Sequence, residues 1–164
     1  MDIALECAAC GAFIAGGRDA CQSLFDHYNG LALSDVAFGR VHRILVDAYC
    51  MQHLEPYCRS AKSYAAHLAG LCWAMRYGGG PDGYAAIQRW LSTASNLNKP
   101  PVLDMLGELT VTHIRGATGP SEHARRVHEW ASDVWAAYSS QHELAEQWIV
   151  LAFAAAKAPR TPRR

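Results

Sequence analysis

Residues that start or stop helices recur along the sequence, and these helix-boundary residues constrain its fold more than any other feature. Ser60 precedes the run AKSYAAHLAGLCWAMRY, which ends at Gly78-Gly79-Gly80. Because serine is a preferred N-cap residue and glycine often ends a helix, this run predicts one complete helix. The sequence contains no alternation of apolar and polar residues long enough to indicate a strand. We therefore expect an all-α fold.

Four further segments carry apolar residues at helical spacing between similar boundaries. The stretch from Asn96 to Pro120 holds several Pro and Gly residues and is expected to be irregular, with a short helix at 110–114. The predicted helices run from Asp19 as N-cap to about Tyr28 with Asn29-Gly30 as the stop, from Asp35 to about Leu54 with Pro56 closing the helix, from Ser60 to Tyr77, from Asp82 past Leu91, and from Ser121 as N-cap to Lys157.

The composition fits one compact, folded domain. The chain has 164 residues, 51% of them hydrophobic, and 15 basic residues balance 15 acidic ones. This balance argues against a disordered chain and against a dedicated nucleic-acid-binding surface, which would be basic. We expect a single-domain helical bundle over residues 1–157, with a Cys-rich knuckle at 1–17 and a disordered basic tail at 158–164.

The N-terminus indicates a cytoplasmic protein. The segment MDIALECAAC lacks the basic start and the long apolar run of a signal peptide. The longest apolar stretch, Trp148 to Ala156, is about half as long as a membrane span needs to be. We therefore expect no membrane partner and consider nucleic acid unfavoured, which leaves an unknown protein or small molecule as the partner. In a reducing compartment, cysteines bind metal or react more often than they form disulfides.

The motif Cys7-Ala-Ala-Cys10-Gly11 carries the clearest chemistry in the sequence. Six cysteines and eight histidines are many for a chain of this length. Two thiolates at this spacing can grip one side of a tetrahedral Zn²⁺, and the following glycine permits the tight turn. Free thiols at a frayed terminus and a redox dithiol are the alternatives. A redox dithiol is disfavoured because such motifs follow a strand, and none is expected before Cys7.

A zinc site needs two more donors, and Cys21 and His53 are the candidates. Cys21 is the nearest third thiol, close to the start of the first predicted helix. His53 lies at the end of the second predicted helix, where the knuckle can reach it. His42 is eleven residues away from His53, about 16 Å along a helix axis, so the two histidines cannot share one ion. We predict Cys7, Cys10, Cys21 and His53 as the ligands. Completion of the shell by Cys50 or by another histidine, and a packed or capping His53, are the alternatives.

A second polar group is predicted between the second and third helices. If these helices form an antiparallel hairpin, His67 comes level with Asp47, and Cys72 with His42. An Asp that faces a His can fix an imidazole tautomer for catalysis or metal binding, but it is also a common structural hydrogen bond. In the catalytic interpretation His67 is the base, Asp47 orients it, and His42 is a further member.

The segments CAACGA, HRILVDAYCMQH and HLAGLC resemble an uncharacterised bacterial family that is classed as a domain of unknown function. Its members carry CxxCG near the start, a central H-x4-D-x-Y-x2-Q-H block and a late WA-x3-W segment. The family often has a proline directly after the QH pair, whereas this chain has Leu54 there and Pro56 two residues later. The resemblance implies a single domain and no particular reaction. The matching positions are Cys7, Cys10, Gly11, His42, Asp47, Tyr49, Gln52, His53, Trp130, Ala131 and Trp135.

Three functions are consistent with these patterns. The first, which we favour, is a small cytosolic zinc-binding helical protein whose zinc is mainly structural and whose role is binding or regulation. The second is a small metalloenzyme or acid–base enzyme that uses an Asp47/His67 pocket in the middle of the bundle. The third is a thiol redox sensor in which oxidation of Cys7 and Cys10 releases zinc.

Overall fold

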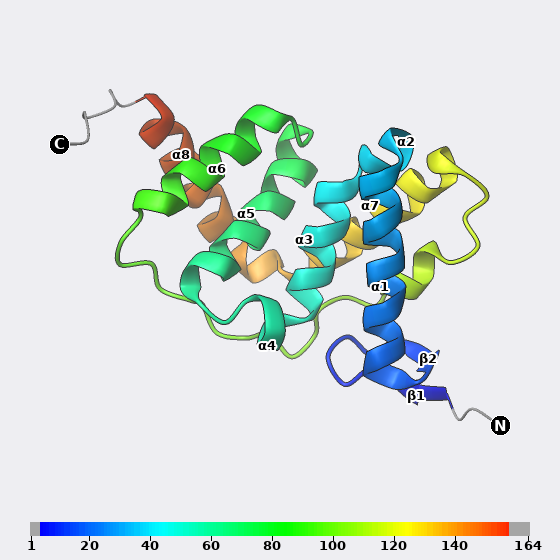
Figure 1. Cartoon of the computed structure of the whole chain (residues 1–164). Helices are drawn as coiled ribbons and strands as arrows, with labels where there is room; N and C mark the ends of the chain where they lie inside the picture. Colours follow the sequence, from blue (N-terminus) through cyan, green and yellow to red (C-terminus); the bar gives the residue numbers. More distant parts are fainter. Residues whose placement is uncertain (1–3, 158–164) are drawn as a thin grey trace.

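The computed structural model describes residues 4–157, and these residues form a helical bundle (Figure 1). The all-α prediction is confirmed, whereas the predicted disordered tail lies outside the described residues. None of the described helices is long and apolar enough to cross a membrane. The elements are β1 (Ala4–Glu6), β2 (Phe13–Ala15), α1 (Gly17–Ser34), α2 (Val36–Gly39), α3 (His42–Gln52), α4 (Leu54–Tyr57), α5 (Ala61–Tyr77), α6 (Pro81–Thr93), the 3-10 helix η1 (Val111–Ile114), α7 (Pro120–Ala137), the 3-10 helix η2 (Ser139–Gln141) and α8 (His142–Lys157).

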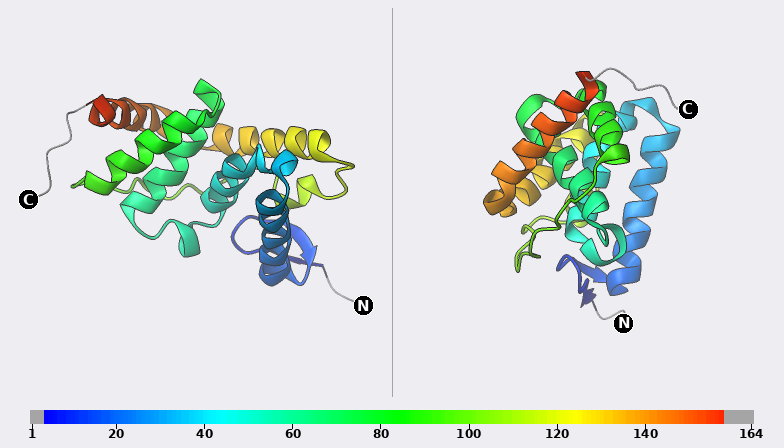
Figure 2. Two further views of the ribbon diagram at one scale, coloured as in Figure 1. Left: turned by 45° about the horizontal axis from the view of Figure 1, so that its top comes forward. Right: turned by 90° about the vertical axis from the view of Figure 1, so that its left-hand side faces the viewer.

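Helix α3 is the central element of the bundle. It packs against α5 and α7 and also contacts α1, while α6 packs mainly against α8 (Figure 1). In Figure 2, α7 and α8 follow one another along one side of the molecule, and α1 stands beside α3 with the β1–β2 hairpin at its N-terminal end. The hairpin and α8 therefore lie at opposite ends of the molecule.

Polar side chains reach from the buried face of α3 to the irregular segment that follows α6. The Gln52 side-chain amide donates to the backbone oxygens of Leu106 and Leu109 at 3.0 and 2.8 Å. The indole N–H of Trp130 on α7 donates to Gln52 Oε1 at 2.9 Å. Because all three contacts are made by one buried side chain, they fix the segment against α3 and α7 without leaving a polar group unpaired.

The prediction that no strand precedes Cys7 was wrong, because β1 ends at Glu6, directly before it. The lack of a strand therefore does not argue against a redox dithiol. β1 and β2 form an antiparallel pair with Glu6 opposite Phe13 and Ala4 opposite Ala15. Each strand has three residues, which is too short for an alternation of apolar and polar residues to stand out.

The first two predicted helices have different boundaries in the structure. α1 begins at Gly17, after Gly16 as N-cap, and continues through Gly30 to Ser34, so Asp19 lies in the first turn. The segment predicted as the second helix forms three shorter helices in the structure, α2, α3 and α4. Pro56 lies inside α4 and does not end the segment. The third helix is confirmed, with Ser60 and Ser63 forming a capping box at its start.

The predicted long last helix is broken near Tyr138 into α7, η2 and α8. The ring of His142 stacks on Trp135 with centroids 3.7 Å apart, and its Nε2 donates to the Trp135 backbone oxygen at 2.8 Å. The Tyr138 hydroxyl donates to the Met51 backbone oxygen on α3. The break is thus held by contacts that lie outside the local helix pattern. The predicted short helix near 110–114 is confirmed as η1.

We predict opposite effects for alanine at two helical glycines. A Cβ at Gly70 on α5 would overlap Oδ2 of buried Asp47, so Gly70→Ala is expected to lower the free energy of unfolding by about 2–3 kcal/mol. Gly30 lies in α1 with open space around it, so Gly30→Ala is expected to raise that free energy by about 0.5–1 kcal/mol. Urea denaturation measures both effects. Equal stabilities for the two variants would contradict the close approach of α5 to Asp47.

Candidate metal centre

The CxxC motif forms the tip of the β1–β2 hairpin. The Cys7 backbone N–H donates to the Ala12 oxygen at 2.9 Å, and the Gly11 N–H donates to the Cys7 oxygen at 2.8 Å. Gly11 has φ +75°, a left-handed conformation that glycine adopts without steric cost. The turn therefore brings the Cys7 and Cys10 side chains to the same side of the tip, as the sequence predicted.

The other two predicted donors come from separate helices. Cys21 lies on α1, which begins directly after β2, and is fully buried. His53 is the C-cap residue of α3, at the junction with α4, and is 2% exposed. The hairpin, α1 and the α3–α4 junction thus converge on one point.

The structure brings all four predicted donors together. One donor atom from each of Cys7, Cys10, Cys21 and His53 lies within 4.8 Å of the others. The Cys10 and Cys21 sulfurs are 3.7 Å apart. His53 Nε2 is 3.7 Å from the Cys7 sulfur and 3.5 Å from the Cys21 sulfur.

These separations match the edges of a metal-centred tetrahedron. With metal–sulfur bonds of about 2.3 Å and metal–nitrogen bonds of about 2.0–2.1 Å, tetrahedral angles give about 3.8 Å between two sulfurs and about 3.6 Å between sulfur and nitrogen. The three measured distances lie within 0.1 Å or so of these values. The residues present therefore suit a metal ion that prefers three sulfur donors and one nitrogen donor.

The orientation of His53 is fixed by its neighbour on α3. Because a carbonyl oxygen only accepts, the 2.8 Å contact between His53 Nδ1 and the Tyr49 backbone oxygen places the ring proton on Nδ1. The Tyr49 ring stacks on His53 at 3.8 Å and on Phe25 of α1 at 3.9 Å. The lone pair of Nε2 is thereby directed at the sulfurs, which is the arrangement that metal-binding histidines use.

The cluster favours negative charge on Cys21. The hydrogen bond between the Cys10 and Cys21 side chains lowers the pKa of the Cys21 thiol to about 4, although burial acts in the opposite direction. The same hydrogen bond, together with burial, raises the pKa of Cys10. Around them, Gln22 Oε1 accepts from the Tyr49 and Tyr57 hydroxyls at 3.3 and 2.9 Å. The polar surroundings of the sulfurs are therefore held in place by paired side chains.

The other three cysteines have a different environment. Cys50, Cys58 and Cys72 are buried among apolar side chains of the core. Burial raises the pKa of Cys58 and of Cys72 to about 12, and it also raises the pKa of Cys50. These thiols stay protonated and serve as small core residues.

The predicted Asp47–His67 pair is present in the structure. His67 Nδ1 donates to Asp47 Oδ1 at 2.8 Å, and Arg43 Nε lies 3.6 Å from Oδ2. Asp47 is fully buried, and this burial is the main cause that raises the pKa of its carboxyl. Its carboxylate packs directly against Gly70. The full burial of Asp47 favours a structural pair, and a catalytic role for the pair stays a prediction.

The remaining polar residues of the segment HRILVDAYCMQH have separate partners. His42, predicted as a third catalytic residue, has its Nε2 2.8 Å from Asn29 Oδ1 on α1, and burial lowers its pKa. Tyr49 contacts Cys21 and His53 of the Cys/His group, and Gln52 accepts a hydrogen bond from Trp130. The segment thus joins α3 to several elements and does not form one site.

Some contributing residues were missed in the sequence. Arg43 stands four residues before Asp47, and this helical spacing could have indicated the ion pair. Gln22 and Tyr57 carried no signal, because their role depends on how α1 and α4 meet. Buried His123 on α7, which lies near the rings of Tyr28 and Phe38, was also missed.

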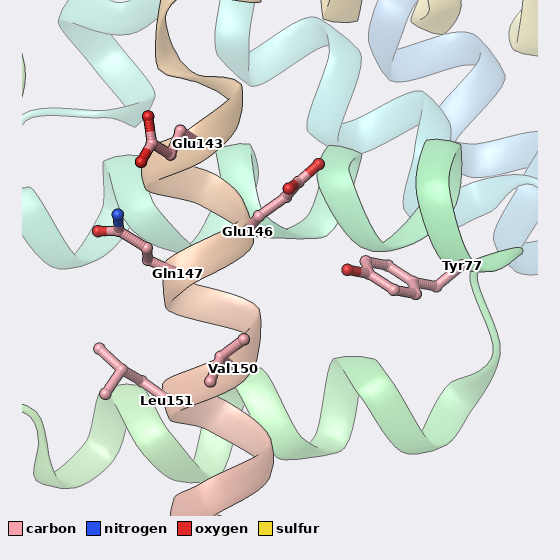
Figure 3. A pocket seen from close by; sticks show the side chains of 6 residues that line it. All are labelled: Tyr77, Glu143, Glu146, Gln147, Val150 and Leu151. Atoms are coloured by element: carbon pink, nitrogen blue, oxygen red, sulfur yellow. The ribbon is translucent and has the colours of Figure 1, made fainter.

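A surface groove lies at the other end of the molecule, on the outer face of α8 (Figure 3). Figure 3 shows Glu143, Gln147 and Leu151 one turn apart along α8, with Tyr77 at the end of α5 across from Val150. The groove combines apolar side chains with carboxylates and is separate from the Cys/His group.

The fold and the donor cluster together define a small helical protein that could hold one metal ion where its N-terminal hairpin meets α1 and α3. The chain belongs to the family of unknown function DUF5946, whose model matches residues 5–139. The resemblance to an uncharacterised family is thereby confirmed. The matched range contains the four donors and the Asp47–His67 pair and ends before α8. No curated protein and no solved structure matches the chain.

We predict that His67→Ala destabilises the protein by about 3 kcal/mol, because it leaves the buried Asp47 carboxylate without its hydrogen-bond donor. The matched control is His128→Ala on the exposed side of α7, which is expected to change stability by less than about 0.5 kcal/mol. Chemical denaturation checks both values. Combining His67→Ala with Asp47→Asn should cost clearly less than the sum of the two single changes, and an additive result would contradict direct coupling.

Proposed function

We propose that the protein is a zinc-binding helical protein in which Cys7, Cys10, Cys21 and His53 hold a structural Zn²⁺. The observation that carries the proposal is the convergence of three sulfurs and one oriented imidazole nitrogen at tetrahedral separations. Sulfur-rich tetrahedral sites favour zinc among the common divalent ions, with iron as the main competitor.

A structural role is supported by the number of protein donors. Four protein ligands fill a tetrahedral shell, whereas catalytic zinc sites keep one position for water or substrate. The ion would join the hairpin, α1 and the α3–α4 junction, which are separated by up to 46 residues in the chain. An isolated two-stranded hairpin is only marginally stable, so this end of the molecule gains the most from a cross-link.

We further propose a binding or regulatory role in the cytoplasm, with a protein or small molecule as partner. A reducing compartment would keep the thiols available for the metal. The balance of 15 basic and 15 acidic residues makes nucleic acid an unfavoured partner. The enclosure of the Asp47 carboxylate supports this role over an enzyme built on Asp47, His67 and His42.

The proposal predicts one zinc ion per chain and a matching loss of stability when a ligand is removed. We expect Cys10→Ser to lower the Tm by about 10 °C, the shift that about 3 kcal/mol produces in a domain of this size. Cys58→Ser is the control, because Cys58 is fully buried but lies outside the donor group. Its Tm is expected to fall by only about 3 °C, which corresponds to about 1 kcal/mol. Elemental analysis and thermal denaturation measure the two quantities.

For these two variants, packing alone would give the opposite order of Tm losses. Cys10 is partly exposed, so packing alone would make its replacement the milder change of the two. A strong chelator should lower the Tm of the wild type to that of Cys10→Ser and leave the variant unchanged. Freshly purified protein without metal, or Cys58→Ser as the more damaging change, would count against a zinc cross-link. Iron at the same stoichiometry would keep the site but overturn the assignment of the ion.

A further inference from the structure

The four donors differ in their access to solvent. Cys7 and Cys21 are fully buried, and His53 is 2% exposed. Cys10 is partly exposed, because it lies at the tip of the hairpin, just before the turn at Gly11. A small reagent that approaches the group from solvent therefore meets Cys10 first.

The sulfur of this partly exposed residue also has a defined neighbour. The Cys10 sulfur is in contact with the Cys21 sulfur at 3.7 Å, while the Cys7 sulfur contacts His53 Nε2 at 3.7 Å. Cys10 and Cys21 are eleven residues apart and belong to different elements, the hairpin tip and α1. A disulfide of about 2.05 Å would need these sulfurs to approach by less than 2 Å or so.

We propose that Cys10 is the site at which peroxide oxidises the zinc centre, and that it forms a disulfide with Cys21 that releases the metal. This inference rests on the zinc site proposed above. It differs from a dithiol switch between the two cysteines of the CxxC motif, because the second sulfur comes from α1.

The reaction balances with hydrogen peroxide as the oxidant. Metal coordination keeps the sulfurs deprotonated, and the thiolate is the nucleophilic form. The Cys10 thiolate attacks one peroxide oxygen, the O–O bond breaks, and Cys10 sulfenic acid and hydroxide result. The Cys21 thiolate then attacks the Cys10 sulfur, the S–S bond forms, and a second hydroxide leaves. Two protons from solvent convert both hydroxides to water, so two thiolates have supplied two electrons.

Oxidation changes which elements the centre joins. After the disulfide forms, Cys7 and His53 are the two donors left, and two donors are too few to retain Zn²⁺ against solvent. The disulfide still connects the hairpin to α1, but the connection of both to the α3–α4 junction is lost. In the oxidised protein the hairpin and α1 thus stay joined to each other, but the metal no longer holds them to the α3–α4 junction.

The sequence permits a direct test by disulfide mapping. Trypsin cleaves after Arg18 and Arg40, which places Cys7 and Cys10 in peptide 1–18 and Cys21 in peptide 19–40. Zinc-loaded full-length protein is treated with one equivalent of hydrogen peroxide, and free thiols are then alkylated. We expect loss of two of the six thiols, release of one zinc ion to a chromogenic chelator, and a cross-link between the two peptides. Fragmentation should place the alkyl group of peptide 1–18 on Cys7.

Controls separate this inference from the zinc proposal. Cys72→Ala, which removes a buried thiol outside the centre, should behave as the wild type. Dimedone added with peroxide should label Cys10 and leave Cys7 and Cys21 unlabelled. A disulfide inside peptide 1–18, labelling of Cys7, or zinc retention after thiol loss would overturn the inference while the zinc site stands. Elemental analysis before oxidation shows separately whether zinc is bound at all.

Discussion

The contact between His53 Nδ1 and the Tyr49 backbone oxygen is the interaction on which the N-terminal end of the molecule depends. It fixes the tautomer of His53 and points Nε2 at the sulfurs of Cys7 and Cys21, which belong to two other elements. The contact exists because α3 ends at Gln52, so that His53 can fold back on the last turn while its ring stacks on Tyr49. If α3 continued as one regular helix, its backbone would keep the Tyr49 oxygen for its own ladder, and the imidazole would not be oriented by it. The position at which α3 ends thus determines whether the imidazole of His53 can face the β1–β2 hairpin, which is distant in the sequence.

Helix α3 is buried along most of its length, yet it carries polar side chains at two buried positions, Asp47 and Gln52. Each of these positions is paired with a different element: Asp47 with His67 on α5, and Gln52 with Trp130 on α7 and with the segment after α6. A purely apolar helix could be packed in several rotations at similar cost, whereas an unpaired buried carboxylate or amide is expensive. The polar residues of α3 therefore select one rotation of the helix and, with it, the position of His53.

The sequence predicted those features that depend on local chemistry. The ends of α5 followed from Ser60 and Gly78, and the donor set followed from CxxC spacing and the position of His53 at a helix end. What it missed depends on tertiary contacts. Gly30 was interpreted as a stop, although α1 continues because Tyr28 and Ala32 on either side of it are buried against the bundle. The break between α7 and α8 has no glycine or proline, and the stacking of His142 on Trp135 that stabilises it cannot be identified from either residue alone.

The six cysteines serve two purposes that composition alone does not separate. Cys50, Cys58 and Cys72 lie on or beside the central helices, where burial keeps them protonated and removes them from reagents in solvent. Cys7, Cys10 and Cys21 lie at the end of the bundle, where their sulfurs are close to one another or to His53 and where Cys10 is partly exposed. Thiol chemistry is therefore confined to the N-terminal end. The core that holds His53 in place contains thiols of its own, but its packing does not depend on their reactivity. A change at the Cys/His group can therefore alter the attachment of the hairpin without disturbing helix α3, which positions His53.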